Sequence, residues 1–356
     1  MNYRSSQIRR QVALTVFLSL VGSVLLGVAA IALHAGTPEQ DALQTAPTPS
    51  RTGPRIGNGR NFTQSLPSGA SIEGSLPLYT FTFGLIDYPR SNVSGIWGIN
   101  DHGKMVGGYN NTNMELYSAD HGYELRGNNF STINYPGAMQ TDLFSINKSG
   151  EIVGAFGNSQ TDCCHGFKLV SGIYTQLDCP GSNFTVALGV NNSGDIVGMC
   201  ADPKTGNATG YLLSGGVYTS IIVPGAIYTY TDGINNAGVV AGYYFDTGHN
   251  SHGFTWNKGT ITTLDYGNGY PNTYLAGIND TGVIVGGYGT NMTIGSIVYP
   301  WEHGFLYSSG TFSTFDVPFG DVQVTEPVGM NNKGEIVGGY ADSQGMLYGF
   351  YAKATP

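Results

Sequence analysis

The amino-acid sequence predicts an all-β protein, a six-bladed β-propeller with four-stranded blades. Three observations support this fold: one phrase of twelve residues occurs six times, its spacing matches a blade, and each repeat contains short apolar runs separated by turns. Four antiparallel strands in about 40–45 residues is the length of one propeller blade. The six copies read GINDHGKMVGGY at 98–109, SINKSGEIVGAF at 145–156, GVNNSGDIVGMC at 189–200, GINNAGVVAGYY at 233–244, GINDTGVIVGGY at 277–288 and GMNNKGEIVGGY at 329–340.

Each copy is anchored by one asparagine, and the intervals between successive anchors are 47, 44, 44, 44 and 52 residues. Asparagine and glycine tolerate left-handed backbone, so each Asn-x-x-Gly predicts a tight turn. Calcium needs several oxygen ligands, and these turns carry too few carboxylates to supply them. We therefore expect no metal and no cofactor. The anchors are Asn100, Asn147, Asn191, Asn235, Asn279 and Asn331.

The unit around Asn191 illustrates the sequence pattern that predicts one blade. Its apolar runs are 185–190, 195–200, 209–214 and 217–223, and the turn Gly215-Gly216 joins the last two. Strand-length runs joined by such turns predict antiparallel hairpins. No helical periodicity occurs after residue 35.

The two ends of the repeat region predict how the ring closes. The last unit ends with the run at 349–352 and lacks a fourth run, whereas an unmatched fourth run, LYTFTFGLIDYP, stands at 78–89. We expect this N-terminal strand to pair beside the 349–352 strand. A closed ring also predicts a monomer.

The N-terminal 77 residues predict export. Residues 12–33 form an uncharged, mostly apolar run of 22 residues behind Arg4, Arg9 and Arg10. Such a run spans a bilayer as a helix, with its basic flank in the cytoplasm. Residues 1–35 are therefore a signal anchor, or a signal peptide cleaved near 30–32. The Pro/Thr/Gly/Ser-rich segment 36–77 is expected to be a flexible linker to the propeller at 78–356. Either signal places the propeller outside the cytoplasm, at the cell surface or in the periplasm, or in the medium if it is cleaved.

Composition excludes one class of partner. The net charge is -9, only 11% of residues are charged, and no basic stripe is visible. Nucleic-acid binding depends on neutralising phosphates, so none is expected.

A His-Gly-aromatic step follows four of the six turns, at 121–123, 165–167, 252–254 and 303–305. Together with the turns it resembles the HAF repeat of bacterial extracellular repeat proteins. Glycine replaces the central alanine of that motif throughout, and Thr209 and Tyr348 stand in place of histidine in the other two units. The resemblance implies an exported repeat protein of the cell envelope and no particular activity.

The four cysteines predict disulfides, because the chain is expected to be exported. If Ser171-Gly172 is a two-residue turn, Val170 opposes Ile173, and counting outward places Cys164 opposite Cys179. We therefore expect a Cys164–Cys179 bond. Cys163 and Cys200 remain as a candidate bridge between adjacent blades.

A hydroxyl residue stands six positions before each anchoring asparagine. If the first strand of each blade is innermost, these hydroxyls lie near the channel mouth. They form either a polar collar for a ligand or hydrogen bonds within the preceding turn. They are Ser94, Thr141, Thr185, Thr229, Thr273 and Thr325.

The connections between the second and third strands, and between blades, vary in length and share one face of the propeller. Variable loops on a repeated scaffold commonly carry a binding site. This face is predicted to gather aromatic and acidic residues suited to a glycan or protein ligand. The candidate ligand-binding residues are Trp301, Glu302, Tyr299, Tyr228, Tyr230, Tyr274, Tyr135 and Glu326.

The main functional hypothesis is therefore an extracytoplasmic binding or scaffolding module. One alternative is a secreted glycosidase or lyase that uses two acids of the same face, and a second is a purely structural envelope protein. No nucleophile elbow, phosphate loop or zinc motif is present, and no catalytic residue is assigned. The acids that break the repeat pattern are Asp142, Asp232, Glu302, Asp321 and Glu326.

Overall fold

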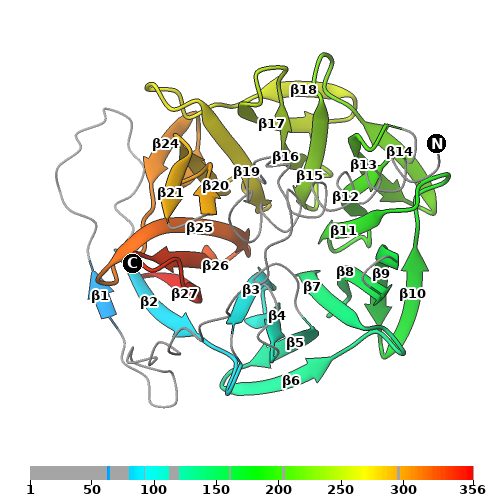
Figure 1. Ribbon diagram of the computed structural model, residues 1–356, viewed down its shortest axis with the longest axis horizontal. Helices are drawn as coiled ribbons and strands as arrows, with labels where there is room; N and C mark the ends of the chain where they lie inside the picture. The colour runs from blue at the N-terminus through cyan, green and yellow to red at the C-terminus, as the bar shows by residue number, and fades with distance from the viewer. Residues whose placement is uncertain are drawn as a thin grey trace, which may run out of the picture.

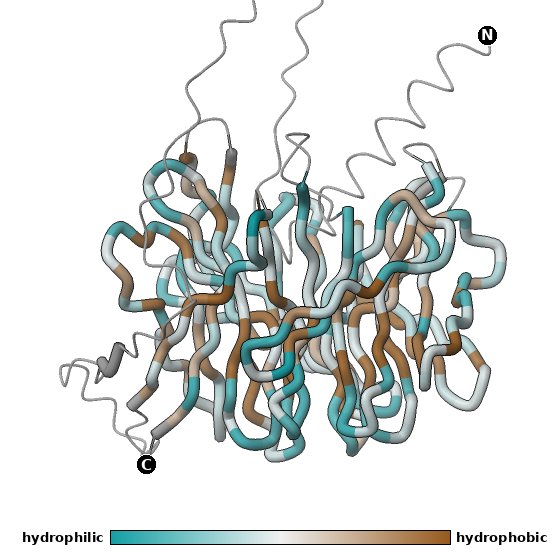
Figure 2. The backbone as a smooth tube through the Cα atoms, turned by 90° about the horizontal axis from the view of Figure 1, so that it is seen from below, coloured by the Kyte–Doolittle hydropathy of each residue, from teal (hydrophilic) through white to brown (hydrophobic). Residues whose placement is uncertain are grey.

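The protein is a six-bladed β-propeller, seen here in a computed structural model that describes residues 62–64, 80–91, 93–111, 120–159, 162–202, 205–294 and 297–355. Its blades are antiparallel sheets arranged around a central axis (Figure 1). All regular elements in these ranges are strands. Hydrophobic residues gather in the middle of the strands, and hydrophilic residues occupy the turns (Figure 2). The predicted architecture of six four-stranded blades is confirmed.

The first three blades follow the chain from the innermost to the outermost strand. Blade 1 contains β3 (Val93–Ile99), β4 (Lys104–Asn110), β5 (His121–Arg126) and β6 (Asn129–Ile133). Blade 2 contains β7 (Gln140–Ile146), β8 (Ile152–Ser159), β9 (Asp162–Val170) and β10 (Ile173–Leu177). Blade 3 contains β11 (Thr185–Val190), β12 (Ile196–Ala201), β13 (Ala208–Ser214) and β14 (Val217–Ile221).

The last three blades include an insertion and the junction of the two chain ends. Blade 4 contains β15 (Tyr228–Ile234), β16 (Val240–Phe245), β17 (Ser251–Asn257) and β18 (Thr260–Thr263). Blade 5 contains β19 (Asn272–Ile278), β20 (Ile284–Gly289), β23 (His303–Ser308) and β24 (Thr311–Thr314), with the separate hairpin β21 (Met292–Ile294) and β22 (Ile297–Tyr299) inserted before β23. Blade 6 contains β25 (Val322–Met330), β26 (Glu335–Asp342), β27 (Leu347–Thr355), β2 (Thr80–Ile86) and β1 (Phe62–Gln64).

Both ends of the repeat region share blade 6, where β2 pairs antiparallel with β27. Phe81, Phe83 and Ile86 of β2 are buried, with 2%, 3% and 6% of their surface exposed. The edge strand β1 lies within the segment expected to be a linker and pairs with β2. Residues 78–79, like the expected helix at 12–33, lie outside the described ranges. No helix among the described residues has the length and hydrophobicity to span a membrane.

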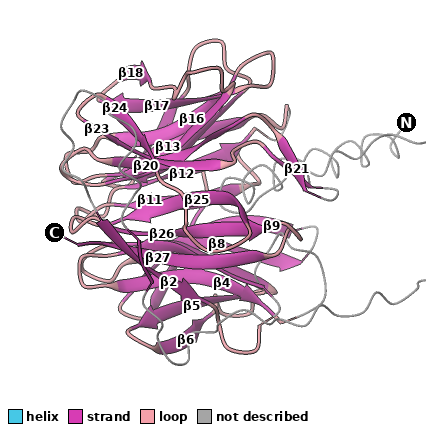
Figure 3. Ribbon diagram, turned by 90° about the vertical axis from the view of Figure 1, so that its left-hand side faces the viewer, coloured by secondary structure: helices cyan, strands magenta, loops and turns pink. Residues whose placement is uncertain are grey.

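The two faces of the propeller differ in their connections. One face, the turn face, carries the Asn-x-x-Gly turns and the short turns between third and fourth strands. The other, the loop face, carries the longer connections and the β21–β22 hairpin, which projects from the disc (Figure 3). The glycines of the Asn-x-x-Gly turns all have positive φ, for example 79° at Gly194. A side chain at these positions would be strained, which explains the invariant glycine.

The anchoring asparagines do more than form turns. They are buried, and at five junctions they link one blade to the next. Asn191 Oδ1 accepts hydrogen bonds from the backbone N–H groups of Ser193 and Asp195, at 3.0 and 2.9 Å. Its Nδ2 donates to the carbonyl of Asn235 in the neighbouring blade, at 3.2 Å. The same bond between blades, at 3.0 to 3.2 Å, is donated by Asn100, Asn147, Asn235 and Asn331.

The residue after the anchor also bridges blades at five junctions, where its side-chain oxygen accepts a backbone N–H of the preceding blade. Asn192 Oδ1 accepts a hydrogen bond from the backbone N–H of Lys148 at 2.9 Å, and Asp280 Oδ1 accepts one from Asn236 at 2.8 Å. Both asparagine and aspartate supply such an oxygen, and they occupy this position in every blade except blade 2, where it is Lys148. The anchor position needs an amide donor as well, so aspartate cannot replace asparagine there.

Each innermost strand contains a β-bulge three residues before its anchor. In blade 3 the register shifts between Ala187 and Gly189, which leaves Leu188 as the extra residue. A Cβ added at Gly198, on the paired strand β12, would collide with the carbonyl oxygen of Val186. The equivalent glycine meets the same obstacle in every blade. The bulge changes the direction of the extra side chain, which is a common effect of β-bulges.

The predicted cysteine pairing is wrong. The turn at Ser171-Gly172 does place Val170 opposite Ile173, as expected, but the ladder between β9 and β10 ends at Leu177. Cys179 lies beyond the ladder and donates its backbone N–H to Thr185 Oγ1 in the next blade. It is bonded to Cys200, with 6.2 Å between the Cα atoms. Cys164 is buried and also disulfide-bonded, so neither Cys164–Cys179 nor Cys163–Cys200 forms.

The Cys179–Cys200 bond joins two positions between blades 2 and 3. At other blade junctions the equivalent two positions carry stacked aromatic rings. Ring centroids lie 3.7 Å apart for Tyr88 and Tyr109, 3.6 Å for Tyr135 and Phe156, and 3.5 Å for Tyr266 and Tyr288. In each pair one residue follows the outermost strand of a blade, and the other lies on the second strand of the next blade. The disulfide therefore replaces a packing contact with a covalent one.

We expect Asn191→Asp to lower the free energy of unfolding by about 1–3 kcal/mol, because the buried Asn235 carbonyl loses its donor and faces a carboxylate. The matched control is Asn192→Asp, which keeps the only side-chain oxygen that its contact requires. Chemical denaturation of both variants measures the difference. Equal losses of stability in the two variants would contradict a special role for the anchor amide.

Ring closure through β2 stays a prediction, which deletion of residues 78–89 tests. Losing the buried side chains of β2 removes about 1.5–3 kcal/mol each and exposes the edge of β27. The truncated protein should melt at lower temperature and self-associate in light scattering. A monomer with the melting temperature of the full chain would show that β2 is dispensable.

Candidate functional site

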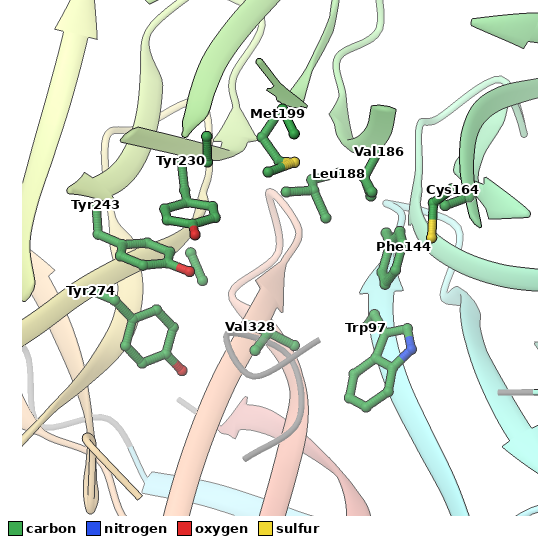
Figure 4. Packing of buried hydrophobic residues seen from close by; sticks show 14 of the residues in the cluster. Trp97, Phe144, Cys164, Val186, Leu188, Met199, Tyr230, Tyr243, Tyr274 and Val328 are labelled. Atoms are coloured by element: carbon green, nitrogen blue, oxygen red, sulfur yellow. The ribbon is translucent and has the colours of Figure 1, made fainter. Parts of the chain in front are cut away.

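The innermost strands of all six blades direct two layers of side chains toward the propeller axis. These are the residues three and five positions before each anchoring asparagine. Eight of them belong to one buried cluster, and Figure 4 shows members from different blades facing one another around the axis. The layer three positions before is Trp97, Phe144, Leu188, Asp232, Ala276 and Val328, and the layer five positions before is Gly95, Asp142, Val186, Tyr230, Tyr274 and Glu326.

The axis has an apolar side and a polar side. Blades 1 to 3 contribute large apolar groups to the first layer, whereas blades 4 to 6 contribute Asp232, Ala276 and Val328. Adjacent to these, Tyr274 and Glu326 are buried, with 0% and 1% of their surface exposed. We call Asp232, Tyr274 and Glu326 the axial cluster. Its three residues come from the innermost strands of three successive blades.

Four buried polar atoms of the axial cluster lack partners within the described part of the chain. These four atoms are enclosed and form no hydrogen bond there. They are Asp232 Oδ1, the Tyr274 hydroxyl oxygen and both carboxyl oxygens of Glu326. Buried polar groups in folded proteins are nearly always satisfied, so four such atoms at one place call for an explanation. In Figure 4 the Tyr274 hydroxyl points toward Val328 on β25, the strand that also carries Glu326.

Burial dominates the electrostatics of this cluster. It raises the pKa of Asp232 to about 8 and raises the pKa of Glu326 well above its usual range. Burial, followed by the charges of Glu326 and Asp232, raises the pKa of Tyr274. Both carboxyls therefore lie near the phenol, and among the described residues neither has a nearby cation that offsets its loss of solvation.

An aromatic cluster adjoins the axial cluster on the side of the loop face. Tyr230 stacks on Tyr243, with ring centroids 4.7 Å apart, and Trp301 lies 4.4 Å from Tyr274. Trp301 comes from the connection after β22, and its Nε1 donates to Ser251 Oγ of blade 4 at 2.9 Å. It therefore ties the insertion of blade 5 to blade 4.

On the turn face, the axis opens into a hollow of about 70 Å³ whose walls repeat in every blade. The anchoring asparagines, the apolar residues before them and the polar residues after them form these walls. Asp232 lies two positions before Ile234, which lines the hollow, and it keeps part of its surface exposed. The hollow therefore lies on the turn-face side of the layer that contains Asp232.

The structure moves most of the predicted ligand-binding residues from the surface to the interior. Tyr299 is fully buried, and Trp301, Tyr230 and Tyr274 line the axis, so none of these four forms an exposed aromatic surface. Tyr230 and Tyr274 lie on the innermost strands β15 and β19, and Trp301 lies in a connection that contacts blade 4, so their role in ligand binding stays a prediction. Glu326 is also buried. Three candidates stay partly exposed on the loop face, namely Tyr135, Tyr228 and Glu302.

All three of these partly exposed candidates have structural contacts. Tyr135 forms the stack with Phe156 at a blade junction. Glu302 Oε1 accepts hydrogen bonds from the backbone N–H and the hydroxyl of Thr290, at 3.1 and 2.7 Å. Tyr228 packs against the edge of the central apolar cluster.

The ring of hydroxyl residues braces the turns between blades and does not form an open polar collar. Thr185 Oγ1 accepts the backbone N–H of Cys179 at 3.0 Å, and Thr229 Oγ1 accepts that of Val223 at 3.2 Å. All six residues are buried and accept an equivalent bond. The other four are Ser94, Thr141, Thr273 and Thr325.

The repeated histidines form contacts within their own blades. His252 Nδ1 lies 2.8 Å from Asp265, and His303 Nδ1 lies 2.9 Å from Asp316, thirteen residues later in each case. The hydrogen bond to Asp316 raises the pKa of His303. These pairs join third and fourth strands around the outside of the ring. No group of three or more His, Cys, Asp or Glu residues able to hold a metal occurs in the described ranges.

Sequence reasoning identified Asp232 and Glu326 as acids that break the repeat, but it did not place them together. The signal that could have done so was their position relative to the anchors, because residues three and five positions before an anchor share one side of the strand. The sequence also contained a signal for the role of the anchors in joining blades. All six anchors are asparagine and none is aspartate, which indicates that the amide nitrogen is needed.

No family model and no curated protein matches the sequence. Among solved structures, a gluconolactonase from Xanthomonas campestris is 10% identical, with a TM-score of 0.48, over 83% of this chain and 98% of that one. A variant of Aleuria aurantia lectin in complex with Fucα1-6GlcNAc is 10% identical, with a TM-score of 0.46, over 74% and 95%. The β-propeller domain of the Trilobed protease from Pyrococcus furiosus is 9% identical, with a TM-score of 0.41, over 74% and 94%. These likenesses concern the fold alone.

The raised pKa of Asp232 predicts a pH-dependent cost to folding. Between about pH 4 and pH 8 the folded chain keeps this proton while the unfolded chain releases it, so stability falls as the pH rises through that window. Asp232→Asn should therefore stabilise the protein by about 1–3 kcal/mol at pH 8, and by less at pH 5.

Thermal unfolding at the two pH values, in a buffer free of amines and divalent cations, measures this difference. The matched control is Asp321→Asn, because Asp321 lies on the exterior and contacts Ser343. An effect of Asp232→Asn that is the same at both pH values would contradict the assignment of Asp232 as the titrating group.

Proposed function

We propose that this chain is an extracytoplasmic binding module whose loop face recognises a glycan or a protein. The observation that carries the proposal is the contrast between the two faces. On the turn face the same side-chain contacts recur from blade to blade, whereas the loop face carries a different connection in each blade. Repeated scaffolds that vary on one face commonly place recognition there.

Exposed apolar groups on the loop face support this choice. Met139 and Ile222 have 57% and 59% of their surface exposed, in the connections that lead into blades 2 and 4. The partly exposed ring of Tyr135 lies in the first of these connections, and that of Tyr228 follows the second at the start of β15. Apolar and aromatic side chains of this kind form the centres of protein interfaces and the platforms for sugar rings.

The disulfide indicates an oxidising compartment outside the cytoplasm. We further propose that residues 12–33 anchor the propeller in the membrane, with the N-terminus inside, and that the chain is an extracellular repeat protein of the HAF type. A propeller closed through blade 6 would be a monomer.

An enzymatic role is the alternative, in which two acids of the chain serve a glycosidase or lyase. The geometry offers one pair of inward-facing acids with raised pKa, Asp232 and Glu326. A raised pKa suits a general acid. Both residues lie at the axis beneath side chains that fill the loop-face side, so a polysaccharide chain has no path to them from that face. The binding role therefore remains the main proposal.

Binding of the exported protein to a glycan array and to envelope extracts tests the proposed function. We expect Tyr228→Ala combined with Met139→Ala to weaken binding about tenfold or more, because it removes contact area on the loop face. The matched control is Ile173→Ala, which removes an apolar side chain that is 70% exposed on the turn face. Equal losses from the two changes, or none from either, would contradict recognition by the loop face.

A further inference from the structure

The axial cluster brings together three hydrogen-bonding groups from three successive blades, and four of their atoms are enclosed without a partner among the described residues. The three groups are the Asp232 carboxyl on β15, the Tyr274 hydroxyl on β19 and the Glu326 carboxyl on β25. The proposed role of the loop face does not use them. Buried acids without partners are costly to a fold, so their retention at one place indicates a ligand that completes them.

We propose that the axial cluster binds a primary ammonium group, held by the Asp232 carboxylate, the Glu326 carboxylate and the Tyr274 hydroxyl. The ligand class is therefore a small alkylamine, or the amino group of a larger molecule that enters from the turn face. This site is independent of glycan or protein recognition on the loop face.

The number of acceptors decides between an ammonium group and other cations. A primary ammonium carries three N–H donors, and the cluster offers one acceptor group from each of three blades. Calcium requires six to eight oxygen ligands, more than the two carboxyls and one phenol of the cluster supply. A quaternary ammonium has no N–H donor and would leave both carboxylates unpaired.

The surroundings also favour an organic cation. The rings of Tyr230, Tyr243 and Trp301 adjoin Tyr274, with Trp301 4.4 Å from it between ring centroids. Aromatic faces attract ammonium groups when water is excluded. No lysine, arginine or histidine of the described ranges neutralises either acid, because burial is the single cause of the raised pKa of both Asp232 and Glu326.

Access is from the turn face. The hollow of about 70 Å³ inside the asparagine ring matches a small group rather than a whole sugar ring. Beyond it, Ala276 is the smallest side chain of its layer, and it lies between Asp232 and Val328 in the order of the blades. Asp232 keeps part of its surface exposed and is the first acid that an entering ammonium group meets.

Binding must be linked to proton release. Each carboxyl has to lose its proton before it accepts a charge-assisted hydrogen bond, and burial holds that proton up to about pH 8 at Asp232. Affinity for an alkylammonium should therefore increase between pH 6 and pH 8.5, where the amine itself stays protonated. A site that depends on aromatic contacts alone would show no such increase.

Calorimetric titration of the full chain with methylammonium chloride tests the proposal at pH 8, with NaCl balancing the ionic strength. We expect saturable binding to one site, weakened tenfold or more by Asp232→Asn and by Glu326→Gln, because each removes one charge-assisted bond. Tyr274→Phe should weaken it by a smaller factor. The control Asp321→Asn should leave it unchanged.

A second measurement detects methylammonium binding that is too weak for calorimetric titration. Thermal unfolding in methylammonium chloride should occur at higher temperature than in the same concentration of NaCl, and the two amide variants should lose this difference while they stay folded. Absence of both saturable binding and a thermal shift would overturn the proposal. So would equal binding of tetramethylammonium, selective binding of Ca²⁺, or an affinity unaffected by the amide variants.

Discussion

The amide of the anchoring asparagine is the interaction on which the propeller depends. One side chain shapes the turn through its oxygen and reaches the neighbouring blade through its nitrogen. Asn191 makes both contacts, and Asn331 extends the series from blade 6 to Asn100 in blade 1. Because these bonds are buried, each fixes the position of one blade relative to the next more strongly than an exposed bond would. The repeat of one junction geometry around the axis allows the ring to close.

A second set of contacts at the blade junctions shows that backbone geometry, and not one kind of side chain, sets the spacing. Three junctions place flat aromatic rings against each other at about the thickness of a ring, for example Tyr266 on Tyr288 at 3.5 Å. The junction between blades 2 and 3 instead has the Cys179–Cys200 disulfide. Stacked rings and a disulfide thus occupy equivalent positions at different junctions. The disulfide holds this junction together by a covalent bond instead of by ring stacking.

The same symmetry that builds the ring creates its unusual interior. Six strands converge on one axis, so their inward side chains must pack together or leave polar groups enclosed. Blades 1 to 3 contribute Trp97, Phe144 and Leu188 to the layer three positions before the anchors, whereas blades 4 to 6 enclose Asp232, Tyr274 and Glu326. A structural role alone would favour apolar residues at all of these positions, since unpartnered acids reduce stability. The acids thus mark the place where the sequence departs from what the fold requires.

The sequence by itself determined the number of blades, the strands of each blade and the turn between β9 and β10, because these follow from local periodicity and turn chemistry. It also identified every acid that breaks the repeat. The tertiary structure decided which residues meet. Cys179 pairs with Cys200 because its strand leaves the ladder after Leu177, and Trp301 turns inward because its connection folds over blade 4. Strand pairing repeats every two residues and can be counted along a chain, whereas contacts across an axis depend on the placement of separate sheets, which local patterns do not encode.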